Sequence, residues 1–174
     1  PAHYILAGTP ARNGTETALP NLEGARRLLA TALRTNGFLP AESARSPNLI
    51  VVYHWGLASP TFEDKGAASE LFFNRREILA LLFGRSLEFL GERDHAMVWS
   101  AMREERFFVL VSAYRADDWL TQKKHTLLWR THMSVPKARL SFQNATSILL
   151  AAGGPLLGRD SCGLQSIHID VKGV

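Results

Sequence analysis

Four side chains in two hydrophobic segments have the chemistry of an anion-binding patch. His54 and Trp55 lie near the end of one apolar run, and Arg130 and His132 lie within another. Imidazole and guanidinium groups bind carboxylates and phosphates, and an indole ring provides an apolar border. If the two runs pair in one sheet, these four residues form a cationic, aromatic-edged ligand patch. The alternative is that they are polar residues at a sheet edge together with a hydrogen-bonded core histidine.

A second polar pair lies near the end of the chain. His168 and Asp170 alternate along a predicted strand, so they share one face, and the carboxylate could orient the imidazole for metal binding or proton transfer. Two ligands do not make a metal site, and the other histidines show no ligand spacing. The sequence contains neither HExxH nor GxSxG. We therefore interpret the pair as surface residues and assign no catalytic residue, no metal ligand and no cofactor.

The glycine-rich segment 153–161 has two glycines at the separation found in a phosphate-binding loop. Such a loop needs free backbone N–H groups between a strand and a helix, followed by a lysine and a hydroxyl. Here the glycines follow a predicted helix, Pro155 removes a donor, and Arg159 and Asp160 occupy the other positions. The segment therefore predicts a helix end and a loop.

Composition and charge exclude several classes of protein. The 174 residues are 46% hydrophobic and 21% charged, which excludes a disordered, collagen-like or coiled-coil chain and predicts one domain. Apolar runs are far shorter than the roughly 18 residues of a membrane-spanning helix, so we expect a soluble domain with no transmembrane segment. The net charge of +4 suggests an anionic partner, but basic residues occur as isolated pairs near acidic residues. We therefore do not expect nucleic-acid binding.

Cysteine usage and the first residue say little about the compartment. Cys162 is the single cysteine, so it forms no intramolecular disulfide and belongs to no zinc pattern. The sequence begins at Pro1 without a methionine. Removal of an export signal is one explanation, and design of the expressed fragment is another.

The hydrophobic pattern predicts a single α+β domain over residues 1–174. We expect a mixed or mainly antiparallel sheet of about four to five strands with helices packed on it. The predicted strands span 3–7, 49–56, 107–114, 126–134 and 165–171, the second being central. The predicted helices begin after Asn21, Ser69 and Ser141 and end near Gly37, Gly84 and Gly153, with a further short helix after Asp94.

The strands 107–114 and 126–134 form a predicted hairpin joined by the polar connector 115–125. In the second strand, Trp129 and Met133 alternate with Arg130 and His132. This period of two is typical of an antiparallel strand with one face in the core and one in water.

Three segments carry a resemblance to a known family: Gly37-Phe38 at a helix end, the strand Pro47-Asn48-Leu49-Ile50-Val51-Val52-Tyr53, and Leu128-Trp129-Arg130 in the later hairpin. In these segments the chain resembles a family of uncharacterised bacterial envelope proteins, many of them lipoproteins. Asn48 departs from the usual aspartate. The resemblance implies helices on one side of an antiparallel or mixed sheet, residence in the periplasm or at an envelope membrane, and no known activity. No catalytic residue carries over, and the lipidated cysteine would precede Pro1.

We expect a non-enzymatic envelope module that presents a sheet face or helix surface to an envelope protein, a cell-wall component or a small anionic ligand. The alternative is a hydrolase acting through His168 and Asp170, or through His54 and Arg130. A third hypothesis is an oligomeric structural protein that uses helix 69–84 or a strand edge as its interface. A cytoplasmic location is the alternative to the periplasm or envelope.

Overall fold

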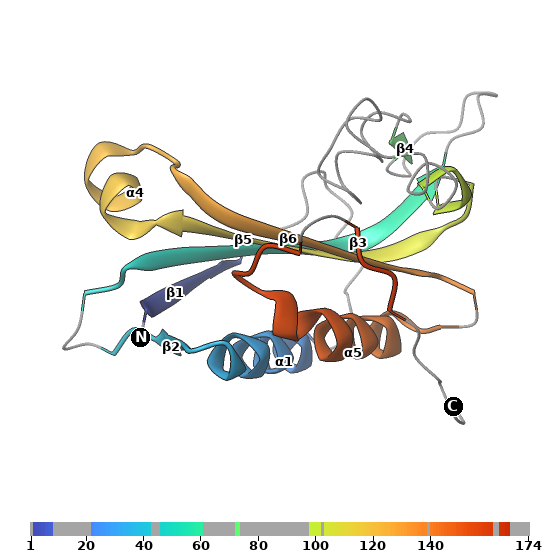
Figure 1. Ribbon diagram of the computed structural model, residues 1–174, viewed down its shortest axis with the longest axis horizontal. Helices are drawn as coiled ribbons and strands as arrows, with labels where there is room; N and C mark the ends of the chain where they lie inside the picture. Colours follow the sequence, from blue (N-terminus) through green and yellow to red (C-terminus); the bar gives the residue numbers. More distant parts are fainter. Residues whose placement is uncertain are drawn as a thin grey trace.

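A mixed sheet with two helices on one face forms the centre of the described part of the chain (Figure 1). The computed structural model describes residues 2–8, 22–42, 46–60, 72–73, 98–101, 103–138, 140–161 and 164–167. The strands are β1 (Ala2–Gly8), β2 (Phe38–Pro40), β3 (Leu49–Pro60), β4 (Phe72–Phe73), β5 (Arg106–Arg115) and β6 (Leu127–Pro136). The helices are α1 (Leu22–Thr35), α4 (Ala116–Gln122) and α5 (Phe142–Gly153), followed by the short 3-10 turn η2 (Gly154–Leu156).

The strand order is β2-β1-β3-β5-β6, and β4 pairs with β3 outside this path. β1 runs parallel to β2 and β3, whereas β3 with β5 and β5 with β6 are antiparallel. This arrangement confirms the predicted α+β fold with a mixed sheet. β3 is the predicted central strand, and it is covered on both faces because Val51 and Val52 are 0% and 4% exposed.

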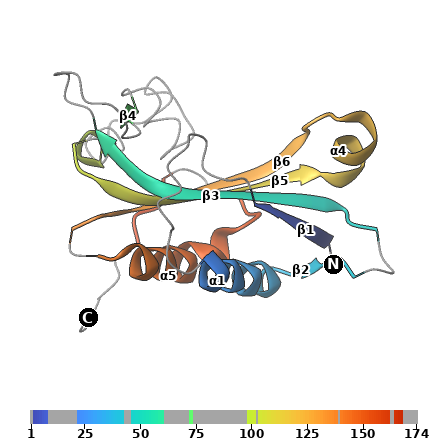
Figure 2. The same ribbon diagram turned by 180° about the vertical axis from the view of Figure 1, so that it is seen from behind.

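α1 and α5 cover the same face of the sheet (Figures 1 and 2). The apolar stripe of α1 faces the core while Arg26 and Arg34 are exposed, as its helical spacing predicts. The Ser141 hydroxyl caps α5 by accepting a hydrogen bond from the Asn144 N–H at 3.2 Å. None of the helices in the described part of the chain is long and apolar enough to cross a bilayer.

The main core lies between this helix-covered face and the two helices. Its fully buried members include Leu29, Leu33, Val51, Val109, Val111 and Leu157. Phe38 of β2 and Trp129 of β6 come from opposite edges of the sheet, yet their ring centroids are 5.5 Å apart. The sheet therefore curls around the helix-covered face. Gly158, at φ +73°, lies against Phe38, and a Cβ there would be 2.6 Å from the ring.

Several predicted elements differ from the structure. The connector 115–125 contains α4, which packs through tertiary contacts that a polar sequence does not reveal. Phe72 and Phe73 form a short strand against Ser59 and Pro60 rather than part of a helix. The remainder of the helix predicted up to Gly84 lies outside the described residues.

Two other predicted elements lie only partly within the described residues. Residues 98–101 are helical, which agrees with the short helix expected after Asp94. Residues 164–167 are not a strand, and Ile167 is 49% exposed rather than in the core, so this part of the predicted strand 165–171 is wrong. Residues 168–171 lie outside the described residues. The segment 153–161 ends α5 and forms η2, as predicted.

Candidate functional site

The pairing of β3, β5 and β6 places three of the four predicted patch residues on one face. His54 lies opposite Leu110, and Leu110 lies opposite His132, so the two histidines belong to one row across the sheet. The next row contains Ser112 and Arg130. Their strand neighbours Tyr53, Val111 and Met133 are in the main core, so this row faces away from α1 and α5. We call this side the distal face.

Trp55 does not belong to the patch, which corrects the prediction. One residue after His54, it projects to the opposite side of the sheet because side chains alternate along a strand. Its ring lies 4.8 Å from that of Tyr53 and 6.3 Å from that of Phe142 in α5. Trp55 therefore packs against the main core on the helix-covered face.

Arg130 is held in place by two neighbours on β5. Its Nε donates a hydrogen bond to Ser112 Oγ at 2.9 Å, and Nη2 donates to the Tyr114 hydroxyl at 3.1 Å. These bonds use two of the five guanidinium N–H groups. No carboxylate of the described residues forms an ion pair with Arg130, and the side chain is exposed. An oriented positive charge with spare donors is therefore available on the distal face.

His54 lies close enough to Arg130 to be affected by its charge. Burial lowers the pKa of His54 from its ordinary value, and the positive charge of Arg130 lowers it further. A neutral imidazole at neutral pH offers one donor and one acceptor. His54 therefore adds no positive charge to that of Arg130 at neutral pH.

A second distal-face cation, Arg106, is neutralised by its surroundings. Its guanidinium forms an ion pair with Glu104, and Nε donates to Ser134 Oγ at 3.1 Å. Burial lowers its pKa, while Glu104 acts in the opposite direction. Aspartate and glutamate are absent from the described distal-face positions of β3, β5 and β6. The uncompensated charge on these strands is that of Arg130.

An aromatic cluster borders Arg130, and it does not include Trp55. Its rings are Tyr114 of β5, Trp119 of α4 and His125 in the loop after α4. The Trp119 ring stacks on His125 with centroids 4.0 Å apart and planes at 22°. Tyr114, which contacts Arg130, lies 5.1 Å from Trp119 and 6.2 Å from His125. An aromatic border therefore lies beside Arg130, but it does not contain Trp55, the aromatic residue that the sequence predicts there.

Tertiary contacts fix α4 over the distal face. The Ala116 N–H donates to the Asn48 carbonyl at 2.9 Å, and Ala116 is fully buried with Ile50 and Val52. Trp119 packs against the same cluster. Sequence analysis missed Ser112, Tyr114, Trp119 and His125. The alternation in strand 107–114 could have placed the first two beside Arg130, but the sequence of α4 carries no comparable signal.

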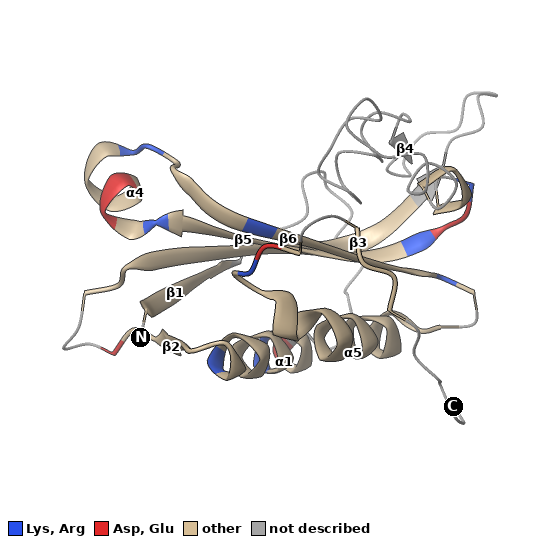
Figure 3. Cartoon of the chain, viewed as in Figure 1, with Lys and Arg blue, Asp and Glu red and all other residues tan. Residues whose placement is uncertain are grey.

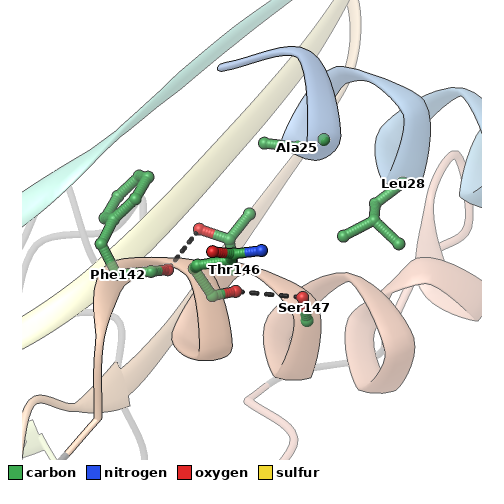
Figure 4. A pocket seen from close by; sticks show the side chains of 7 residues that line it. Ala25, Leu28, Phe142, Thr146 and Ser147 are labelled. Carbon is green, nitrogen blue, oxygen red and sulfur yellow. Dashed lines mark hydrogen bonds between the residues drawn. The ribbon is translucent and has the colours of Figure 1, made fainter. Parts of the chain in front are cut away.

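A shallow pocket lies between α1 and α5, away from the distal face (Figure 4). Two hydroxyls line it, but Thr146 donates to the Phe142 carbonyl at 2.9 Å and Ser147 donates to the Gln143 carbonyl at 3.0 Å. Both hydroxyl protons are therefore used within α5. The pocket has less polar chemistry to offer a ligand than the distal face.

His168, Asp170 and Cys162 lie outside the described residues. Within the described ranges, no three His, Cys, Asp or Glu side chains lie together as a metal site would require. No protein-family model, no curated protein and no solved structure matches the chain. The chemistry of the site therefore rests on its own side chains.

Proposed function

We propose that the chain is a binding module whose distal face takes an anionic group, a carboxylate or a phosphate, on Arg130. The main support for this proposal is the position of the Arg130 side chain. Ser112 and Tyr114 orient its guanidinium, which forms no ion pair with a described residue. Arginine presents its donors in a planar fork that matches both kinds of anion. Tyr114 and Trp119 provide an aromatic border beside Arg130.

The same geometry supports binding over hydrolysis. A hydrolase that acts through a side-chain hydroxyl needs that hydroxyl to be accessible and within hydrogen-bond reach of a base. Ser112 has a hydroxyl within the patch, but it is 2% exposed and accepts a hydrogen bond from Arg130. The backbones at His54 and His132 are separated by two strand spacings, about 10 Å. We therefore favour a non-enzymatic role over the hydrolase alternative.

We further propose that the module acts in the bacterial envelope, in the periplasm or at a membrane, on the resemblance of its β3 and hairpin segments. Asn48, the residue at which the chain departs from that family, forms hydrogen bonds with β1 and α4. Its Oδ1 accepts a hydrogen bond from the His3 N–H at 3.1 Å, and its carbonyl accepts one from Ala116. An aspartate oxygen would accept the first bond equally well, so the departure at this position changes no interaction that positions the patch.

Calorimetric titration with inorganic phosphate, phenyl phosphate and benzoate tests this function. We expect saturable binding to the unmodified chain and at least about a tenfold loss in Arg130→Gln, because charge-assisted hydrogen bonds to an anion contribute about 1.5–3 kcal/mol. Arg26→Gln is the matched control, since Arg26 is an exposed arginine on α1. Equal affinity in both variants would contradict the proposal, and turnover of phenyl phosphate that depends on His54 would favour the hydrolase.

A further inference from the structure

The end of the molecule formed by α4 and the start of β6 exposes large apolar side chains. Leu120 is 58% exposed, and Leu127 and Leu128 are each 44% exposed. Seven large hydrophobic side chains are exposed among the described residues, and these three come from one short stretch of chain. Figures 1 and 2 both show α4 at one extreme of the long axis, raised above the sheet on the side away from α1 and α5.

Local structure holds two of these leucines outward. In α4, Ala116 and Trp119 pack toward the sheet, and Leu120 stays largely in solvent. In β6, Trp129 pairs with Ala113 and Leu127 pairs with Tyr114, so Leu128 is an extra residue at a register shift. A β-bulge of this kind re-aims side chains and bends the strand. The exposure of Leu128 therefore follows from the backbone.

Two lysines follow α4 at the same end of the molecule. Lys123 occupies the left-handed C-cap position at φ 53°, and Lys124 is the next residue. Both are exposed, and neither forms an ion pair with a described carboxylate. Arg115 and Asp118 compensate each other at 3.7 Å, which leaves Asp117 as the remaining acid. Figure 3 shows the acids in α4 and basic residues in the loop that follows it.

We infer that this end of the chain, residues 115–128, docks on the surface of an anionic phospholipid bilayer. The leucines would enter the interfacial layer, the Trp119 ring would lie at the level of the headgroups, and the lysines would contact lipid phosphates. A bilayer fits this surface better than a protein partner does. A stable protein interface needs roughly 800 Å² on each side, whereas a bilayer accepts a narrow projection with a few apolar side chains.

The inference is independent of the anion site, because it rests on the leucines and lysines rather than on Arg130. Arg115, Lys123 and Lys124 against Asp117 and Asp118 give residues 115–128 a net charge of +1. With this charge and three exposed leucines, the contact is reversible and sensitive to salt. Neutral vesicles should bind more weakly than anionic ones, since each lysine near an anionic surface contributes about fivefold in affinity.

Co-sedimentation of the full chain with vesicles tests the inference. One set consists of phosphatidylcholine and the other of equal parts phosphatidylcholine and phosphatidylglycerol. We expect binding to the anionic vesicles that added salt reduces. The double variant Leu120→Ser, Leu128→Ser should bind the anionic vesicles at least about tenfold more weakly, because apolar burial drives interfacial insertion. The double variant Lys123→Ala, Lys124→Ala should lose the preference for anionic over neutral vesicles.

Leu28→Ser is the matched control, since Leu28 is 39% exposed but lies on α1 at the other face. It should bind anionic vesicles like the unmodified chain. Circular dichroism confirms that each variant is folded. The inference is overturned if anionic vesicles do not pellet the chain, if the leucine variant binds unchanged, or if the same leucines instead support a concentration-dependent dimer.

Discussion

Arg130 Nε lies 2.9 Å from the Oγ of Ser112, directly across the β5–β6 pair of the sheet. Ser112 is 2% exposed and sits on a strand that is paired on both sides, so its hydroxyl is a fixed acceptor. An exposed arginine normally samples many rotamers, and fixing it on binding opposes association. The Ser112 contact therefore orients the guanidinium before a ligand arrives.

The Ser112 contact gives the first prediction. Ser112→Ala removes the acceptor but keeps the charge of Arg130, so anion affinity should fall about three- to tenfold, in line with about 1 kcal/mol for one such hydrogen bond. Calorimetric titration with phenyl phosphate measures it. Ser147→Ala is the control, because that hydroxyl bonds within α5. Unchanged affinity in Ser112→Ala would mean that the contact does not orient Arg130.

The second prediction concerns the titration of His54. Burial, followed by the charge of Arg130, holds the pKa of His54 below its ordinary value. NMR of the imidazole protons against pH should show a depressed midpoint, and Arg130→Gln should move that midpoint upward. Identical midpoints in the two proteins would show that the guanidinium does not act on His54.

The same shift has a consequence for stability. The unfolded chain binds a proton at His54 more readily than the folded chain does, so stability is fully present above about pH 6.5 and falls as the pH drops toward the folded pKa. His54→Gln should reduce this acid loss of stability, measured by denaturant unfolding over a pH series. If His54→Gln loses as much stability at acid pH as the unmodified chain does, other groups cause the loss.

Two glycines with positive φ give a matched pair of stability measurements. Gly37→Ala, at φ +81° with open space around it, should destabilise by about 1 kcal/mol from backbone strain alone. Gly158→Ala, at φ +73°, adds a clash with Phe38 and should destabilise by about 1–3 kcal/mol more. Chemical unfolding measures both. Equal losses of stability in the two variants would show that the Phe38–Trp129 contact can rearrange around the new methyl group without a cost in free energy.

Trp119 should matter more to stability than its neighbour on α4. Trp119→Ala removes the rings that pack on Tyr114 and His125, so we expect a loss of about 1–3 kcal/mol for this half-buried side chain. Leu120→Ala, at a largely exposed position, should change stability by less than about 0.5 kcal/mol. Thermal unfolding compares the two variants. A reversed order would show that α4 is not held by Trp119.

Sequence predicted those parts of the fold whose signals are local. The β-branched run at Val51 and Val52 identified the central strand, and Ser141 and Gly37 marked helix ends that the structure confirms. α4 was missed because its apolar residues are few and its place depends on distant partners at Asn48 and Ile50. A local pattern cannot report such contacts.

The sequence likewise predicted one part of the candidate site and not the other. His54, Arg130 and His132 share a face because antiparallel pairing and a period of two determine it. Trp55 follows His54 directly in sequence but lies on the opposite face, because side chains alternate along a strand. The aromatic border depends on α4 folding over Val52, which no residue near Trp119 signals. The role of His168 and Asp170 stays a prediction, since both lie outside the described residues.

Titration of the isotopically labelled chain with phenyl phosphate, followed by NMR at the Arg130 side-chain N–H and the Ser112 and Tyr114 amides, tests the central claim most directly. The anion site predicts saturable shifts that centre on these three residues and vanish in Arg130→Gln. Shifts confined to the groove between α1 and α5, or no saturable shift at all, would contradict it.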